Sequence, residues 1–276
     1  MTDVRAEALE RLAALGVSRH EARWLVEEFL VGSDLDAWSA LEVAATRRLS
    51  GEPLQYIMGH WPFRTLDLDV DSRVLIPRPE TEELVDIALA QLAHGDARNP
   101  LILDLGCGSG AIGLSLAREL GERGIAARVI AVDESIEALD VARRNARRHG
   151  LSTVSFLHSS WYDDVDISLE GRVDLIVSNP PYVSSEDLAG AQPELAHEPL
   201  GALVAPPRDG VEAFDDLASI IDGAPRWLRS GGSLVLEHGA RQSSDVTRRL
   251  FDVGFVEVKD DVDLGGLPRV AHGRWP

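Results

Sequence analysis

One stretch of the sequence decides the fold: LILDLGCGSG, at residues 101–110. An apolar strand runs into a glycine-rich turn, and residues 111 to about 120 then favour a helix. Glycine adopts positive φ and lets a ligand approach the backbone closely, so the turn is a candidate binding loop. A second apolar strand, at 128–132, ends in Asp133, whose carboxylate can accept hydrogen bonds from ribose hydroxyls. The order strand, glycine turn, helix, strand and acid predicts a βαβ nucleoside site.

A second motif, NPPY, follows the apolar run VDLIVS at residues 173–178. Proline fixes φ and has no N–H, so Pro180 and Pro181 stiffen the chain beside Asn179. The Asn179 carbonyl and a neighbouring backbone carbonyl, that of Pro180, can together accept both hydrogens of an –NH2 group. Tyr182 can offer its flat face to a planar substrate. The motif predicts a site that grips a planar amide or an exocyclic amine without a general base or a nucleophile.

Each of these features also has a purely structural interpretation. Asn-Pro is a common turn signal, and glycines serve any tight turn between a strand and a helix. Asp133 could be a simple helix N-cap, and Trp161, just after the expected third strand, could be a core residue. The βαβ order favours the functional interpretation of the glycines and Asp133, and the second proline, the tyrosine and the preceding strand favour that of Asn179.

Together the two motifs resemble those of class I S-adenosylmethionine-dependent methyltransferases, and NPPY resembles the motif of enzymes that methylate amino nitrogens. Further segments are similar to one subfamily, the protein-glutamine N5-methyltransferases that act on peptide chain release factors. These segments are GEPLQYI (51–57), LIPRPETE (75–82), HEP (197–199), EHG (237–239) and DLGGLPR (263–269).

The resemblance implies an α/β fold with a Rossmann-like, mostly parallel seven-stranded sheet, and S-adenosyl-L-methionine as the cofactor. It implies methylation of the glutamine in the release factor's Gly-Gly-Gln loop, with the release factor as partner. The implied catalytic residues are Asn179, Pro180, Pro181 and Tyr182. The implied cofactor-binding residues are Asp104, Gly106, Cys107, Gly108, Ser109, Gly110, Asp133, Trp161 and Asn179. The backbone of Cys107 should matter more than its thiol.

Several roles stay open. Arg78, Glu80 and Thr81 could form the substrate mouth or simply a first helical turn, and His197 and Glu198 could reach the site from a long loop at 189–210. Glutamine methylation of a ribosomal protein is a close alternative, and methylation of an exocyclic amine in RNA or DNA is a more distant one. The net charge of −19 disfavours a phosphate-rich substrate.

We expect three parts: a helical domain at 1–59 for substrate recognition, a hairpin linker at 60–76, and the methyltransferase domain at 77–276. Ser18 should cap a helix through the N–H three residues on, and Pro79 should open another. Gln55 and Tyr56 should brace the two domains. Strands are expected near 101–105, 128–133, 153–158, 173–178, 233–237, 255–259 and 269–272.

Composition bounds the remaining possibilities. No stretch approaches the roughly 20 apolar residues that span a bilayer, and the N-terminus has no secretory-signal pattern. With one cysteine the chain can form neither an internal disulfide nor a cysteine-based zinc site, and we expect no metal. A cytoplasmic monomer is the simplest expectation. Four arginines at 143, 144, 147 and 148 should form a solvated helix face rather than a partner site.

Overall fold

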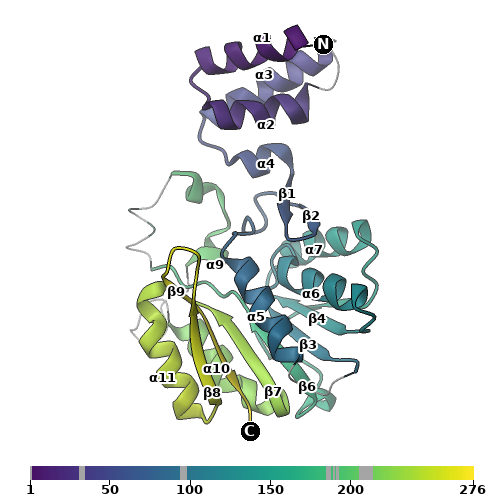
Figure 1. Cartoon of the computed structure of the whole chain (residues 1–276), viewed down its shortest axis with the longest axis vertical. Coiled ribbons are helices and arrows are strands. Elements are labelled where there is room, and N and C mark those ends of the chain that lie inside the picture. Colours follow the sequence, from purple (N-terminus) through teal and green to yellow (C-terminus); the bar gives the residue numbers. More distant parts are fainter. Residues whose placement is uncertain are drawn as a thin grey trace.

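The N-terminal part of the chain is a small helical unit with its own core. The structure is a computed structural model that describes residues 2–30, 35–93, 98–184, 188, 190, 193–204 and 214–276. Ser18 caps the second helix as predicted, its hydroxyl accepting from the Glu21 N–H at 3.3 Å. The helices are α1 (Thr2–Ala14), α2 (Arg19–Phe29), α3 (Leu35–Leu49) and α4 (Leu54–Met58), and they stand apart from the larger body in Figure 1.

A short antiparallel hairpin joins this unit to the larger body. Its strands are β1 (His60–Phe63) and β2 (Leu66–Asp69). The segment that follows packs Val70, Val74 and Ile76 against Tyr56 of α4 and against helix α7 (Ile136–Arg148). The Tyr56 hydroxyl also donates to the Val74 carbonyl at 2.6 Å. The linker is therefore packed on both parts of the chain.

The arginines of α7 hold this linker. Arg148 forms ion pairs with Asp67 and Asp69 of the hairpin, and Arg144 pairs with Asp71 at 3.2 Å. The expectation of a merely solvated helix face was wrong for these two arginines. Arg143 pairs with Asp140 at 3.0 Å, so three of the four arginines are neutralised within the chain.

The body is a seven-stranded sheet in the order β5-β4-β3-β6-β7-β9-β8, in which β9 pairs antiparallel with both β7 and β8 and all other pairs are parallel. This confirms the predicted fold class. The strands are β3 (Leu101–Leu105), β4 (Arg128–Asp133), β5 (Val154–His158), β6 (Val173–Ser178), β7 (Leu228–Glu237), β8 (Val256–Val262) and β9 (Pro268–Arg274). Chain order reverses beside β3, which has β4 on one side and β6 on the other. In open α/β sheets ligands bind at this switch point.

Helices cover both faces of the sheet because its strands alternate between two cores. Ile102 of β3 packs on one face with α5 (Thr81–Ala93), α6 (Ala111–Glu122) and α7. Its neighbour Leu103 packs on the other face with α10 (Asp215–Trp227) and α11 (Ser243–Val253). The short 3-10 helices are η1 (Ile167–Leu169), η2 (Pro193–His197) and η3 (Ala240–Gln242), and α9 (Leu200–Leu203) is a single turn.

Element boundaries differ from expectation in three places. Helix α5 begins at Thr81 rather than at Pro79, because residues 79–80 form a turn in which the Glu82 N–H bonds to the Pro79 carbonyl at 3.1 Å. Strand β7 starts at Leu228, five residues early, since Gly231 and Gly232 do not interrupt it. Within the expected long loop, residues 193–204 contain η2 and α9, while 189, 191–192 and 205–210 lie outside the described residues.

Two glycines of helix α6 give a stability prediction. A Cβ on Gly113 would lie 2.7 Å from Asp104 Oδ2 and 3.1 Å from Val129 Cγ1, whereas one on Gly121 would meet nothing within 4 Å. Gly113→Ala should therefore destabilise the protein by about 1–3 kcal/mol. Gly121→Ala should be neutral or stabilise it by up to about 1 kcal/mol. Thermal unfolding followed by circular dichroism compares them, and equal melting temperatures would contradict the close packing of Asp104 against α6.

Candidate functional site

The two sequence motifs meet at the carboxyl ends of neighbouring strands. Parallel pairing of β3 with β6 sets Leu105 opposite Ser178, so the glycine turn and Asn179 emerge side by side. The buried Ser178 hydroxyl donates to the Leu105 carbonyl at 2.7 Å and ties the two strand ends together. The sequence prediction that both motifs occupy strand ends is confirmed.

A cavity of about 630 Å³ opens beside the glycine turn. Five predicted cofactor-binding residues lie on its wall: Gly106, Gly108, Asp133, Trp161 and Asn179. Pro181, one of the predicted catalytic residues, lies there too. The other predicted cofactor-binding residues, Asp104, Cys107, Ser109 and Gly110, do not line it. Cys107, Ser109 and Gly110 are part of the turn itself, and Asp104 lies in β3 just before it.

The backbone of the turn needs its glycines. Gly106, Gly108 and Gly110 have φ of 71°, 53° and 85°, a region that favours glycine. A Cβ on Gly106 would lie 3.3 Å from Trp161 Cζ3. The turn therefore presents bare backbone to the cavity, with the indole of Trp161 across from it.

Cys107 and Ser109 contribute through their backbones. The Cys107 N–H donates to the Val132 carbonyl at 2.9 Å, and burial raises the pKa of its thiol well above the ordinary value. The Ser109 carbonyl accepts from Asn145 Nδ2 at 2.9 Å. The buried Asn145 amide also bonds to both the N–H and the carbonyl of Asp69, so it joins the glycine turn to the hairpin. Sequence reasoning missed Asn145, since nothing in a helix sequence marks such a bridge.

Two carboxylates stand at the turn. Asp104 is fully buried, Oδ2 accepts from the Gly113 N–H at 2.9 Å, and burial raises its pKa to about 7. Asp133 accepts from the Gly108 N–H at 2.8 Å through Oδ2 and from the Ser135 N–H at 2.9 Å through Oδ1, and burial raises its pKa as well. Since each carboxylate oxygen has two lone pairs, both oxygens of Asp133 keep acceptor capacity.

These features fit a nucleoside cofactor. The cavity has the volume of a small-molecule site. It combines a glycine cradle that a Cβ would fill, a carboxylate with free acceptor capacity and an aromatic ring. Trp161 is itself held in place, because its indole N–H donates to Asp216 Oδ1 at 3.3 Å.

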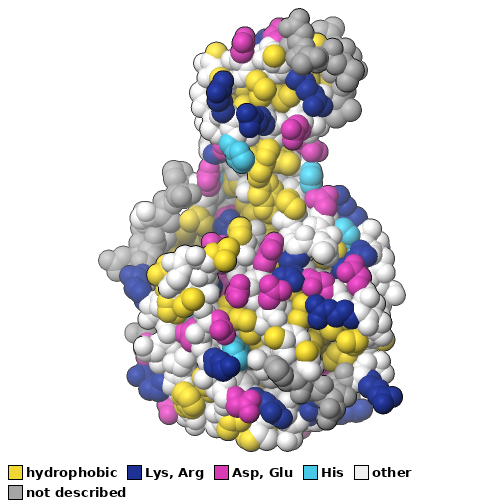
Figure 2. All heavy atoms as spheres, in the orientation of Figure 1, with side chains coloured by type: hydrophobic (Ala, Val, Ile, Leu, Met, Phe, Trp, Pro, Cys, Tyr) yellow, Lys and Arg dark blue, Asp and Glu magenta, His cyan; other side chains and the backbone are white. Residues whose placement is uncertain are grey.

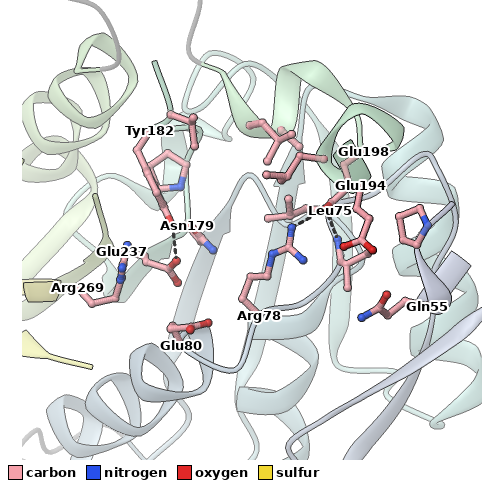
Figure 3. Close-up of a pocket in the computed structure, with 17 residues that line it drawn as sticks. Gln55, Leu75, Arg78, Glu80, Asn179, Tyr182, Glu194, Glu198, Glu237 and Arg269 are labelled. Atoms are coloured by element: carbon pink, nitrogen blue, oxygen red, sulfur yellow. Dashed lines mark hydrogen bonds and ion pairs between the residues drawn. The ribbon is translucent and has the colours of Figure 1, made fainter. Parts of the chain in front are cut away.

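A second cavity, of about 410 Å³, lies on the other side of Asn179 and is shown in Figure 3. Asn179, Leu75 and Ala202 line both cavities. Pro180 faces this second cavity while Pro181 faces the first. Asn179 thus forms part of the wall between two spaces, each large enough for a small molecule or a side chain.

The Asn179 amide is held by a buried chain of hydrogen bonds. Asn179 Nδ2 donates to Thr81 Oγ1 at 3.2 Å, and the Thr81 hydroxyl donates to Glu237 Oε2 at 2.7 Å. The Tyr182 hydroxyl donates to Glu237 Oε1 at 3.0 Å, a contact drawn in Figure 3. Sequence reasoning left the role of Thr81 open and missed Glu237 as a site residue. The signal for Glu237 was an acid directly after the apolar run of β7.

Of the other residues whose roles the sequence left open, three line the second cavity and one does not. Arg78 pairs with Glu198 at 2.5 Å, and Glu198 also accepts from the Ile76 N–H at 3.1 Å. Arg78, Glu80 and Glu198 all line the second cavity. His197 lines neither cavity, and its Nε2 would instead lie 3.8 Å from a Cβ on Gly51 in the helical unit.

Gln55, expected to brace the two domains, also lies on the wall of the second cavity, together with Arg269 of β9.

No helix in the described part of the chain has the length and apolar character needed to cross a bilayer.

The chain is similar to known proteins along almost its whole length. A family model described as "Methyltransferase domain" matches residues 97–259. A release factor glutamine methyltransferase of Xylella fastidiosa is 40% identical, covering 98% of this chain and 95% of that protein. Its counterpart from Burkholderia pseudomallei is 39% identical, covering 99% and 95%. One from Yersinia pestis is 43% identical, covering 85% and 80%.

Solved structures share the fold at much lower identity. The hMettl16 catalytic domain, solved with an RNA hairpin, superposes with a TM-score of 0.60 at 15% identity, covering 92% of this chain and 91% of that chain. A 16S rRNA methyltransferase of T. thermophilus gives a TM-score of 0.55 at 19% identity, covering 79% and 50%. The folds agree, while identity this low carries no information on substrate.

The nucleoside cavity, the Asn-Pro-Pro-Tyr wall and the full-length similarity lead to one conclusion: the chain belongs to the release factor glutamine methyltransferases, enzymes that use S-adenosylmethionine.

Proposed function

We propose that this enzyme methylates the side-chain amide nitrogen, N5, of the glutamine in the Gly-Gly-Gln loop of peptide chain release factors. One observation carries the proposal: Asn179 lines both cavities and so lies where they meet. The cavity beside the glycine turn suits the cofactor, and the cavity beyond Asn179 suits the glutamine side chain. The full-length relatives supply the identity of the protein substrate.

The cofactor must be bound through its nucleoside in the first cavity. The backbone of Gly106 and Gly108, the carboxylate of Asp133 and the indole of Trp161 would hold S-adenosylmethionine. Asp104, Cys107, Ser109 and Gly110 would act by shaping the turn. The cofactor supplies an activated methyl group on a sulfonium, so the protein needs no group to activate it.

The substrate side must overcome a poor nucleophile, because the lone pair of an amide nitrogen is delocalised into its carbonyl. Asn179 Oδ1 and the Pro180 carbonyl accept the two amide hydrogens. They orient the substrate nitrogen toward the cavity in which the cofactor would hold its methyl group. As the lone pair is drawn away, those N–H groups become more acidic and their hydrogen bonds strengthen, which is binding specific to the transition state. The new N–C bond would form as the S–CH3 bond of the cofactor breaks, with S-adenosylhomocysteine as the leaving group. The nitrogen would then lose one of its two protons, through the oxygen that accepts it, to water. Tyr182 covers the planar amide. Alignment of this kind can supply about 7–11 kcal/mol.

A protein substrate fits the charge of the enzyme better than a nucleic acid does. The net charge is −19, and two of the arginines of α7, Arg144 and Arg148, pair with aspartates of the hairpin and linker. Figure 2 shows acidic and basic side chains interspersed over the visible face, with no basic stripe. The second cavity itself carries four glutamates and two arginines on its wall. Nucleic-acid binding depends mainly on Lys and Arg contacts to phosphates, and a surface with this charge is poorly suited to them.

The first prediction concerns the cofactor. Gly106→Ala places a methyl group 3.3 Å from Trp161 at φ 71°, whereas Gly124→Ala has similar strain at φ 76° with nothing within 4 Å. Each should lose about 1–2 kcal/mol of stability. Only Gly106→Ala should also weaken S-adenosylmethionine binding, by about tenfold or more, in isothermal titration calorimetry. Equal affinities in the two variants would remove Gly106 from the cofactor site.

The second prediction concerns the acceptor amide. Asn179→Ala should lower methyl transfer about 10²-fold or more, as loss of one transition-state hydrogen-bonding group does, while cofactor affinity stays within a few-fold. Asn99→Ala, at an exposed asparagine ahead of β3, is the matched control and should turn over normally. Single-turnover assays with labelled cofactor measure the rate. Near-normal transfer by Asn179→Ala would end this account of the chemistry.

The third prediction tests the substrate. Incubation with labelled S-adenosylmethionine and, separately, release factor, ribosomal protein and RNA should label the release factor, and peptide mapping should place the mass shift on the loop glutamine. A release factor with glutamate at that position lacks the –NH2 group and should stay unlabelled. Labelling of the ribosomal protein or of RNA alone would overturn the substrate assignment and leave the methyltransferase fold intact.

A further inference from the structure

We propose that Glu237 is a positioning residue that acts through the Thr81 hydroxyl to fix which end of the Asn179 amide faces the substrate cavity. The proposal rests on the proposed function, because the end in question is the oxygen that would accept the substrate N–H. It concerns residues outside the Asn-Pro-Pro-Tyr motif. Thr81 is at the start of α5, and Glu237 is at the end of β7.

The polarity of the hydrogen-bond chain follows from the number of protons available. An ionised carboxylate only accepts, so the single Thr81 proton goes to Glu237 Oε2, at 2.7 Å. Thr81 Oγ1 can then only accept from Asn179, at 3.2 Å. The –NH2 end of Asn179 must therefore point at Thr81. The opposite orientation would set two acceptors against each other in a buried site.

Asn179 Oδ1 is the end left for the substrate. Asn179 lines the substrate cavity, and its Nδ2 is committed to Thr81. A free asparagine could rotate its amide and present N–H groups, which would repel the substrate's own N–H groups. The Thr81 contact removes that choice before the substrate arrives, and such preorganisation favours the transition state.

The same carboxylate also fixes the far end of the motif. Glu237 Oε1 accepts from the Tyr182 hydroxyl at 3.0 Å, so one buried residue holds the side chains on both sides of Pro180 and Pro181. Glu237 lies close to the Asn-Pro-Pro-Tyr motif because β7 pairs with β6, with Leu236 opposite Ser178. Glu237 and Asn179 therefore emerge from adjacent strand ends.

The arrangement is sensitive to the charge on Glu237. Glu237 is 1% exposed, and its burial raises the pKa of its carboxyl above the ordinary value. Hydrogen bonds from Thr81 and Tyr182 and the charge of Arg269 act to lower this pKa, while the charge of Glu80 raises it further. A protonated Glu237 could donate to Thr81, whose proton would then turn toward Asn179 and admit the wrong end of the amide. The ionised form is the competent one, so turnover should fall as the pH is lowered through this raised pKa.

Thr81 offers a matched pair of variants. Thr81→Val keeps the shape and removes the hydroxyl, while Thr81→Ser keeps the hydroxyl. Thr81→Val should lower kcat about tenfold or more, the range seen when groups that orient a functional residue are lost. Cofactor affinity should change less than threefold, and Thr81→Ser should restore most of the rate. Equal rates in Thr81→Val and the wild type, or equal losses in both variants, would overturn the proposal.

Glu237→Gln tests the charge. Its kcat should be low and should lack the acid limb that the wild type shows. A variant that retained this limb would show that another group titrates, and would also overturn the proposal.

A measurement without turnover separates this proposal from the proposed function. The side-chain –NH2 signals of Asn179, assigned in NMR spectra by their loss in Asn179→Ala, should shift in Thr81→Val and remain in place in Thr81→Ser. Unchanged signals in Thr81→Val would refute the positioning role. If the wild type fails to methylate release factor, the proposed function fails while this spectroscopic result still decides the role of Thr81 and Glu237.

Discussion

The site depends on one pairing, that of the parallel strands β3 and β6 at the point where the chain order reverses. Their register sets Leu105 opposite Ser178, and the Ser178 hydroxyl bonds to the Leu105 carbonyl. A shift of one residue would turn every side chain of a strand to the opposite face. The glycine turn and Asn179 would then no longer face a common space. The cavity beside the glycine turn, the second cavity and the position of Asn179 on both follow from this register.

Around this pairing the enzyme uses buried polar groups to position others rather than to carry out chemistry. Glu237 holds Thr81 and Tyr182, and Asn145 holds the glycine turn against the hairpin. Asp104 holds the start of α6 through the Gly113 N–H. Burying such groups is unfavourable unless they are hydrogen-bonded. Their presence at the strand ends is consistent with a reaction that demands alignment more than acid or base catalysis.

The helical unit is joined to the site by more than a linker. Arg48 of α3 pairs with both Glu21 of α2 and Glu194 of η2, and Glu194 lines the substrate cavity. Glu198, one turn further, pairs with Arg78 and holds the backbone at Ile76. Residues of the linker, of the segment 193–204 that contains η2 and α9, and of the sheet thus line this cavity. The ion pair between Arg48 and Glu194 joins the helical unit to the wall of this cavity.

The sequence by itself determined the fold class and the two motifs, because strands, glycine turns and Asn-Pro-Pro follow from local backbone preferences. The cofactor followed from the resemblance of those motifs to a known family. The sequence placed Gly106, Asp133 and Asn179 at one site through the rule that ligands lie at the carboxyl ends of parallel strands, and the family resemblance added Trp161. Only the tertiary structure decided that Glu237 and Thr81, far apart in the chain, fix the Asn179 amide. It also decided that Arg144 and Arg148 bind the hairpin, that Asn145 bridges it to the glycine turn and that α5 starts at Thr81. Hydrogen bonds and ion pairs of this kind depend on side-chain distances between segments that no local pattern records.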